Sequence, residues 1–337
     1  MKGIIMDKVA FLEANERKEL FQETSAALGI SPAIIEKDFW VCWVLKKIYT
    51  DQELKPLLVF KGGTSLSKVY KLIERFSEDV DLILDWSLLG YGEEEDPYQE
   101  LPSRTQQDSF NKEFNSRAIS YIQSTLCPQL DELLNHCPGV SVAVGRNDPQ
   151  SIEMRYSAAF PQNYLRPEIR LEIGPLASFV PRDEFIIKPF AAEVYPEVFE
   201  AAECPVIAIK AERTFWEKAT ILHQQAHRTS PMPSRYSRHY YDMYRLAKSD
   251  IKEKAFKDLK LLEDVVNFKD RFYPCTWAKY ETAKPGTFKL VPQNKHLDSL
   301  KKDYKQMKIM IFGEVPEFEQ ILNTTAKLED AINALVH

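Results

Sequence analysis

Hydrophobic and polar positions follow two different periods along the chain. Up to about residue 200, short apolar or alternating runs stand between helical stretches, which is typical of strands mixed with helices. After Pro205 the spacing is helical almost to the end, except in a connection at residues 275–294 that contains Pro and Gly. The pattern predicts an α+β lobe followed by a helical lobe, with domains at residues 1–204 and 205–337.

Two helices are predicted at the start of the chain. The first covers residues 7–28 and stops at Gly29. The second begins at Ser31-Pro32, because Ser can cap a helix and Pro suits its first position, and it runs through SPAIIEKDFWVCWVLKKIYT. Its apolar stripe is predicted to lie in the core and consists of Ile35, Phe39, Cys42, Trp43 and Leu45.

Several short segments have strand character. They are LLVF, SEDVDLILD, GVSVAVGR, SIEMRYSAAF and PEIRLEIG, each apolar, alternating or rich in β-branched residues. Residues 86–137 contain an acidic loop, GYGEEEDPYQE, and then a long helical stretch. No chemistry is evident in that region, so we interpret it as an insertion.

A turn follows the strand LLVF. Gly62 and Gly63 let the backbone turn without a Cβ, and TSLSKVYKLIE is expected to begin a helix. The first amides of a helix have no partner inside it and attract phosphate, and the hydroxyls of Thr64 and Ser65 would be further donors. A simple helix-entry turn explains Gly-Gly-Thr equally well.

Two carboxylates on the next strand suggest that this turn is part of a metal–phosphate site. Alternation places Asp79 and Asp81 on one face of DVDLIL, opposite Val80 and Leu82. Paired carboxylates beside a phosphate site suit Mg²⁺, which binds a couple of carboxylates plus substrate phosphates. An adjacent antiparallel strand, PEIRLEIG, would bring Glu172 to them as a third ligand; the alternative is a pair of Arg170 with Glu172 on a solvated sheet face.

Two charged residues stand in the helical half where apolar or aromatic ones are expected. Lys218 falls on the core stripe of IKAERTFWEKATILHQQ, so it requires an anion, unless it reaches water or forms a structural ion pair. Asp242 lies among aromatic residues in SRHYYDMYRLAKS. It would act as a base on an acceptor hydroxyl or pair with Arg238 or Arg245.

Composition and charge narrow the class. The 337 residues have a net charge of −6. The five cysteines are scattered without metal or disulfide spacing, so we expect reduced thiols. The chain has no long apolar run or signal peptide, so we expect a cytoplasmic protein without a membrane span. From Val206 to Phe312, however, 22 Lys and Arg face 12 Asp and Glu. This basic segment could bind polyphosphate or an RNA backbone, although charged helices are more often simply solvated.

Other catalytic motifs are excluded. His223 and His227 have the spacing of a zinc-protease helix, but HQQAH has Gln where that motif needs Glu, so both are expected to be structural. The chain has no nucleophile elbow, Walker A loop, dinucleotide fingerprint or kinase motif.

Four segments in order resemble one known family. FKGGTSLSKVYKLIERFSEDVDL, preceded by IEKDFWVCWVL and followed by AERTFWEKATILH and SRHYYDMYRL, resembles the AbiEii/AbiGii nucleotidyltransferase toxins of type IV toxin–antitoxin and abortive-infection systems, which are related to MenT toxins. The resemblance covers roughly residues 30 to 250 and implies a DNA polymerase β-like core. It also implies catalytic roles for Asp79, Asp81, Lys218 and Asp242, metal binding by the Asp pair and less clearly by Glu172, and nucleotide binding by Lys61, Gly62, Gly63, Thr64, Ser65, Arg75 and Ser77.

The resemblance also implies an activity. Such enzymes use Mg²⁺ to move NMP from NTP onto RNA, for example the tRNA 3′ end, and their antitoxin often acts without stable direct binding. The alternatives are transfer to a protein or small-molecule hydroxyl, or a non-catalytic nucleotide-binding module. The intact set Asp79, Asp81, Lys218 and Asp242 argues against the last.

Overall fold

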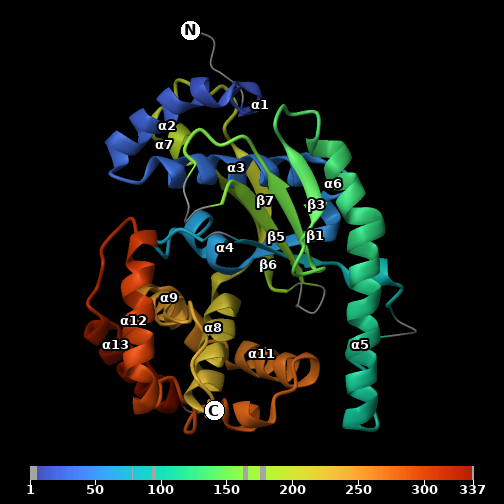
Figure 1. Cartoon of the computed structure of the whole chain (residues 1–337). Helices are drawn as coiled ribbons and strands as arrows, with labels where there is room; N and C mark the ends of the chain where they lie inside the picture. Colours follow the sequence, from blue (N-terminus) through green and yellow to red (C-terminus); the bar gives the residue numbers. More distant parts are fainter. Residues whose placement is uncertain are drawn as a thin grey trace. The chain divides into compact units, whose positions relative to one another are not determined.

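The computed structural model describes residues 6–77, 79–92, 96–99, 101–161, 166–174 and 180–335. The chain forms two compact units, each with its own core (Figure 1). The first unit comprises Met1–Val69 and Ser77–Ala208, and the second comprises Tyr70–Phe76 and Ile209–His337. A short segment ahead of the Asp79 strand therefore belongs with the helical second unit.

A mixed sheet forms the centre of the first unit. Its seven strands lie in the order β3-β4-β5-β2-β1-β7-β6. β1 pairs antiparallel with β2 and parallel with β7, while β5 pairs parallel with β2 and antiparallel with β4. The strands are β1 (Leu58–Lys61), β2 (Asp79–Leu84), β3 (Ser141–Val144), β4 (Ser151–Arg155), β5 (Glu168–Gly174), β6 (Arg182–Ile187) and β7 (Cys204–Ile209).

The central strands have one apolar and one polar face, as period-two alternation requires. In β5, Ile169, Leu171 and Ile173 are buried and the residues between them are half-buried. In β2, Val80 and Leu82 are fully buried, whereas Asp79 and Asp81 are half-buried. Asp79 and Asp81 therefore lie on the polar face, as the alternation of the sequence predicted.

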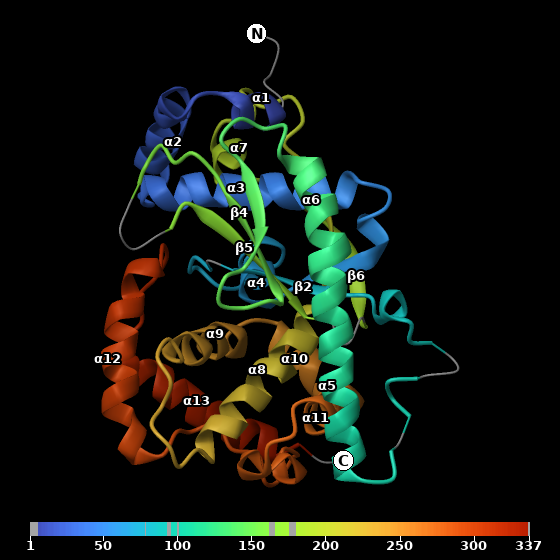
Figure 2. The ribbon, with the colours of Figure 1, turned by 45° about the vertical axis from the view of Figure 1, so that its right-hand side comes forward.

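Helices surround the sheet in the first unit. The α3 helix contacts β5, and Figure 2 shows it running across the sheet behind β4 and β5. Its predicted core stripe is completely buried, which confirms that expectation. The helices are α1 (Met6–Phe11), α2 (Ala14–Leu28), α3 (Pro32–Thr50), α4 (Gly62–Lys68), α5 (Arg104–Tyr121), α6 (Cys127–Leu134) and α7 (Phe190–Val194), with a π-helical turn η3 (Ile122–Leu126) between α5 and α6.

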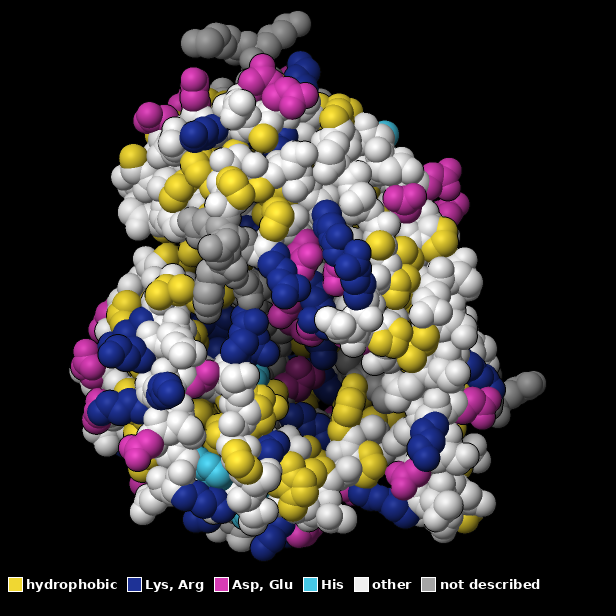
Figure 3. All heavy atoms as spheres, viewed as in Figure 1, with side chains coloured by type: hydrophobic (Ala, Val, Ile, Leu, Met, Phe, Trp, Pro, Cys, Tyr) yellow, Lys and Arg dark blue, Asp and Glu magenta, His cyan; other side chains and the backbone are white. Residues whose placement is uncertain are grey.

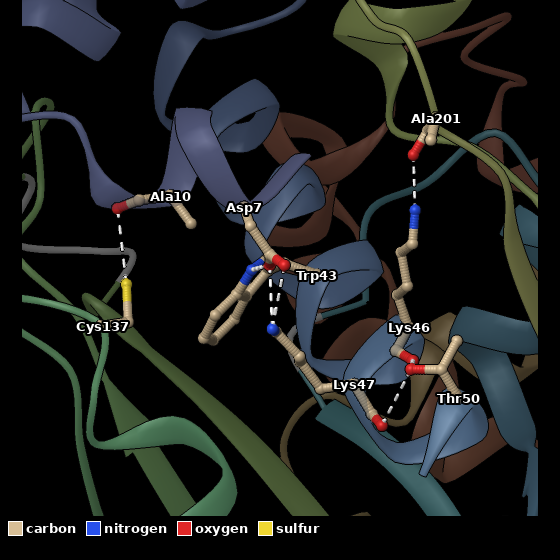
Figure 4. A network of polar contacts seen from close by, with 8 residues as sticks. All are labelled: Asp7, Ala10, Trp43, Lys46, Lys47, Thr50, Cys137 and Ala201. Carbon is tan, nitrogen blue, oxygen red and sulfur yellow. Dashed lines mark hydrogen bonds and ion pairs between the residues drawn. The ribbon is translucent and has the colours of Figure 1, made fainter. Parts of the chain in front are cut away.

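Polar contacts attach α1 to the rest of the first unit (Figure 4). The Asp7 carboxylate accepts a hydrogen bond from Trp43 Nε1 at 2.8 Å and from Lys47 Nζ at 3.0 Å, both on α3. On the other side of α1, the Cys137 thiol donates to the Ala10 carbonyl at 3.4 Å. Cys42, Cys127, Cys137, Cys204 and Cys275 are all free thiols.

The second unit is helical. Its central helix, α8, is amphipathic and contacts α9, α10 and α11, while α9 also contacts α12 and α13. None of the helices among the described residues is long and apolar enough to cross a membrane. The helices are α8 (Ala211–Ala226), α9 (Ser237–Ala247), α10 (Ile251–Phe256), α11 (Leu259–Phe272), α12 (Leu297–Met307) and α13 (Phe318–Asn333).

Three sequence-based expectations about elements were wrong. The first predicted helix is two helices, because Glu13 forms a capping box that starts α2 at Ala14. The helix after the Gly-Gly turn ends at Lys68 instead of continuing through Glu74. The helical period does not begin directly after Pro205, since residues 204–209 form β7 within the sheet.

Candidate active site

The Gly-Gly turn lies directly against the second of the paired aspartates. Gly62 has φ = +78°, a conformation that favours glycine, and a Cβ added there would lie 1.9 Å from Asp81 Oδ2. Lys61 pairs with Asp81 in the β1–β2 register, so their side chains share a face of the sheet. A side chain at position 62 would therefore displace the Asp81 carboxylate, and the positive φ favours glycine independently.

The predicted phosphate-binding hydroxyls at the start of α4 are largely buried. Thr64 Oγ1 donates a hydrogen bond to the Asp79 carbonyl at 2.5 Å, which ties the helix to the strand that carries the carboxylates. Gly63 and Ser65 are also buried. The hydroxyl of Thr64 is thus already engaged within the protein, and its effect is to hold the turn beside β2.

Glu172 lies next to the Asp pair, as expected, but on a strand of the opposite direction. β5 runs parallel to β2, with Asp79 opposite Arg170 and Asp81 opposite Glu172. The expectation of an antiparallel neighbour was wrong, because the connection between the strands includes the long helical insertion and β3 and β4, which allows a crossover. The register still places Glu172 and Asp81 on the same face.

Arg170 is a cation on this face that lies between acidic side chains. Its guanidinium lies 2.8 Å from the Asp148 carboxylate and 3.6 Å from that of Glu172. Burial would lower the pKa of Arg170, but the charges of Glu172, Asp148 and Asp79 outweigh it and raise the pKa. The pair of Arg170 with Glu172, considered from the sequence as the alternative to a metal ligand, is present.

The acidic face meets part of the requirement for a divalent cation. Asp79 and Asp81 supply two hard oxygen ligands on one strand, the number with which Mg²⁺ is usually held together with substrate phosphates. Within the described ranges, no group of three or more His, Cys, Asp or Glu side chains is placed to hold a metal ion. The donor set therefore fits an ion that shares its shell with a phosphate better than an all-protein cage.

The second unit contains a buried cluster of three charged side chains. Asp242 on α9 has an exposed side-chain fraction of 0%, and Arg75 holds it through two hydrogen bonds of 2.7 Å, from Nε to Oδ1 and from Nη2 to Oδ2. Lys218 on α8 lies 2.7 Å from Asp242 Oδ2 and is 8% exposed. We call these three residues the Asp242 cluster.

Two cations around one anion give the Asp242 cluster an excess positive charge. Burial would raise the pKa of Asp242, but Arg75 and Lys218 lower it well below its usual range, so the carboxylate stays ionised. Burial lowers the pKa of Lys218, an effect that Asp242 opposes and Arg75 reinforces. An ionised acid whose oxygens contact two cations is poorly suited to accept a proton.

Arg75 reaches this cluster because its segment belongs to the second unit. The segment is held by hydrogen bonds of Phe76 N to the Met310 carbonyl at 2.8 Å and of Phe312 N to the Glu74 carbonyl at 2.9 Å. Arg245, suggested from the sequence as a partner of Asp242, instead binds Glu74 at 2.8 Å.

Sequence reasoning placed Arg75 with the nucleotide and missed its pairing with Asp242. Ser77, two residues further along and also predicted from the sequence to bind the nucleotide, is buried in the first unit just ahead of β2. The sequence contained a signal for the pair of Lys218 with Asp242, but none for Arg75. Lys218 occupies an apolar position and Asp242 an aromatic segment, and two buried opposite charges require each other.

His223 on α8 is structural, as the sequence analysis expected, and His227 lies just past the end of this helix. His223 Nδ1 accepts a hydrogen bond from Lys289 N at 3.0 Å, so its Nε2 carries the proton and faces the Lys279 carbonyl at 3.1 Å. Burial lowers the pKa of His223 to about 4. A neutral histidine with both nitrogens engaged by the backbone is a core residue.

Comparison with known proteins identifies one family. The family model described as "Nucleotidyl transferase AbiEii toxin, Type IV TA system" matches residues 43–324. A solved structure, MenT4, a nucleotidyltransferase toxin from Mycobacterium tuberculosis H37Rv, is 15% identical in sequence, with 94% of this chain and 99% of that chain covered and a TM-score of 0.42. No curated protein matches the sequence.

Proposed function

Because the chain belongs to the AbiEii family of nucleotidyltransferase toxins from type IV toxin–antitoxin systems, we propose that it transfers NMP from an NTP to an RNA acceptor, the tRNA 3′ end, with Mg²⁺. Membership makes the protein an enzyme that uses NTP, and it implies a cognate antitoxin. The metal, the RNA acceptor and an antitoxin that acts without stable binding are proposals. We also propose that the first unit has the DNA polymerase β-like core of such transferases.

The observation that carries the proposal is the contact between the Gly62 turn and Asp81. The close approach of Asp81 to this turn supports the proposal, because a phosphate bound by the turn's backbone would lie beside a metal ion bound by the carboxylate. A solvated sheet face would have no need of such a close approach. Nucleotidyl transfer needs this juxtaposition, since the protein mainly aligns the reactants and neutralises phosphate charge.

Each residue of the first unit has a proposed role. Asp79 and Asp81 would hold Mg²⁺, with Glu172 as a third ligand if it leaves Arg170. When bound, the ion would neutralise the charge on the transferring phosphate. The nucleotide phosphates would be bound by residues at and near the turn, namely Lys61, Gly62, Gly63, Thr64, Ser65 and Ser77.

In the second unit, we assign the catalytic contribution to Lys218 and a supporting one to Asp242. Lys218 is buried 2.7 Å from Asp242, and a positive charge held there would suit stabilisation of a phosphate anion. The ionised Asp242 would hold Lys218 and Arg75 in place instead of accepting the acceptor's proton. Arg75 would add its positive charge to that of Lys218 while keeping its two hydrogen bonds to Asp242.

The test is transfer of label from each α-labelled NTP to total RNA by the purified protein. Wild type is expected to label RNA only with Mg²⁺, and Asp81→Asn is expected to be inactive because one metal-binding charge is lost. Asp131→Asn on α6 is the matched control, since Asp131 contacts only its helical neighbour Asn135, at 3.4 Å, among the hydrogen bonds of the described residues. Label found only in protein or small molecules would favour the alternative acceptors. When the proteins are expressed in cells, growth arrest by both wild type and Asp81→Asn would contradict the catalytic role assigned to Asp81.

A further inference from the structure

A strongly basic loop precedes α9 in the second unit. Residues 228–238, RTSPMPSRYSR, contain three arginines and no acidic residue. Arg235 is exposed, and Arg228 and Arg238 are half-exposed. We call this segment the arginine loop.

Contacts with α12 and the segment before it fix the conformation of the arginine loop. Arg235 has φ = +66°, uncommon for a residue with a side chain, and its N–H donates to Asp303 Oδ1 at 2.5 Å. Ser237 N donates to the other oxygen of Asp303 at 2.8 Å, and Lys295 Nζ donates to the Thr229 carbonyl at 3.1 Å. One residue of the loop, Arg235, is thus held in an uncommon backbone conformation, as residues at functional sites often are.

These contacts gather cations and a small cavity on one surface. Lys295 and Lys302 are exposed beside the loop. Figure 3 shows several Lys and Arg side chains over α12, with Asp and Glu side chains between them. The cavity has a volume of about 230 Å³. Its walls include apolar side chains such as Met232, the hydroxyls of Ser234 and Ser299, and the charged Lys302 and Asp303.

Aromatic groups lie beside the cations. The Arg228 guanidinium stands 4.8 Å from the centre of the half-exposed Trp277 ring. Tyr236, also half-exposed, contacts His239 with ring centroids 5.2 Å apart. Cations next to partly exposed aromatic rings are the combination that binds single-stranded nucleic acid, by phosphate contact and base stacking.

The basic surface continues toward the buried charges of the same unit. Arg235 is close enough for its charge to repel Arg75, and Arg238 for its charge to repel Lys218. The Asp242 cluster already carries an excess positive charge, so the arginine loop extends a region that attracts anions. A chain of phosphates bound along the loop would be directed toward Lys218.

We infer that the arginine loop, together with Lys295 and Lys302, binds the phosphate backbone of the single-stranded end of an RNA acceptor. This inference rests on the proposed function, for which it names the acceptor-binding surface. The cavity is below the roughly 300 Å³ at which sites for whole small ligands begin, so it suits a single base of the bound strand.

The test measures binding, separately from transfer. Full-length Arg235→Asn/Lys302→Gln is compared with wild type for affinity to labelled unfractionated tRNA over a salt series. Asn tolerates positive φ, so the first change removes charge with little backbone strain. The matched control is Lys254→Gln/Lys260→Gln, which removes the same charge from exposed positions on α10 and α11.

We expect the loop variant to bind tRNA about 10-fold more weakly near 0.1 M salt. The plot of log affinity against log salt should also become less steep by about 1.4, since each of the two lost phosphate contacts contributes about 0.7 to the slope on single strands. The control is expected to match wild type. Lys302→Gln alone, at an exposed position, should show a partial effect without any folding defect.

Unchanged affinity and slope in the loop variant would overturn the inference, as would an equal loss in the control. A loss seen with a DNA duplex but not with tRNA would also overturn it. Binding and activity are tested separately. If wild type labels RNA but the loop variant still binds tRNA normally, the inference is contradicted and the proposed function stands. Conversely, loop-dependent tRNA binding without RNA labelling would contradict the proposed function alone.

Discussion

Replacing Asp242 with Asn keeps the shape of the side chain and removes the anion that Arg75 and Lys218 share. The three contacts with these cations are all 2.7 Å long, and Asp242 is completely buried. In the variant, two buried positive charges would face each other across a neutral amide. We therefore expect a large loss of stability in the second unit.

The magnitude follows from the contacts. At about 4 Å between charges and an effective dielectric constant near 20, each ion pair contributes roughly 4 kcal/mol of Coulomb energy before desolvation. Removing one partner of a buried pair typically costs about 3–5 kcal/mol, because the other charge stays buried. Asp242→Asn should thus lower the free energy of unfolding by about 3–5 kcal/mol.

Hydrogen exchange of peptides from α8 and α9, together with urea unfolding, measures this loss where it occurs. Adding Lys218→Met to Asp242→Asn removes one of the two unpaired cations and should restore part of the stability. Glu74→Gln is the control, because its pair with Arg245 is partly exposed (side chains 38% and 21%) and should contribute about 1 kcal/mol or less. A loss below about 1 kcal/mol in Asp242→Asn would refute the buried-cluster reasoning.

Three further predictions concern the turn, the histidine and the metal. Gly62→Ala should abolish RNA labelling, because its Cβ would lie 1.9 Å from Asp81 Oδ2. The control Gly29→Ala also has positive φ but nothing within 4 Å, so it should lower the free energy of unfolding by about 1–2 kcal/mol and leave the activity per folded molecule unchanged. Equal activities in the two variants would contradict the role of the turn. The pKa of His223 is about 4 in the folded state and about 6.5 in the unfolded state, so the unfolded state binds more protons between these pH values. The free energy of unfolding should therefore decrease by about 1.4 kcal/mol for each pH unit by which the pH is lowered through this range. Urea melts at several pH values measure this slope, which His223→Asn should reduce. EDTA should stop RNA labelling and added Mg²⁺ restore it, while labelling that persists in EDTA would rule out the proposed metal.

Where local pattern alone decides structure, the sequence predicted it correctly. The strand with Asp79 and Asp81 has the expected alternation, and α3 begins at Pro32 with its core stripe buried. Both features follow from the period of the apolar residues and the terminal residues of the element. Ser31 nevertheless makes no side-chain cap, so the helix start depends on Pro32 and burial.

Where distant segments compete with local preference, the prediction failed. The segment after Lys68 has helical spacing, but hydrogen bonds of Phe76 with Met310 and of Phe312 with Glu74 stabilise an extended course instead. These bonds join positions more than 230 residues apart in sequence, which no local period records. The direction of β5 was missed for the same reason, because strand order depends on the whole sheet.

The partner of a buried charge is the part of a site that a sequence conceals most effectively. Lys218 stood out because it interrupts an apolar stripe, and Asp242 because aromatic residues flank it, yet helical spacing suggested Arg238 and Arg245 as the partners of Asp242. Burial decides the pairing, since a cation that pairs with a completely buried carboxylate must itself be buried. Arg75 satisfies that condition through the extended segment that failed to become a helix, so the error in the helix and the error in the partner have one physical cause.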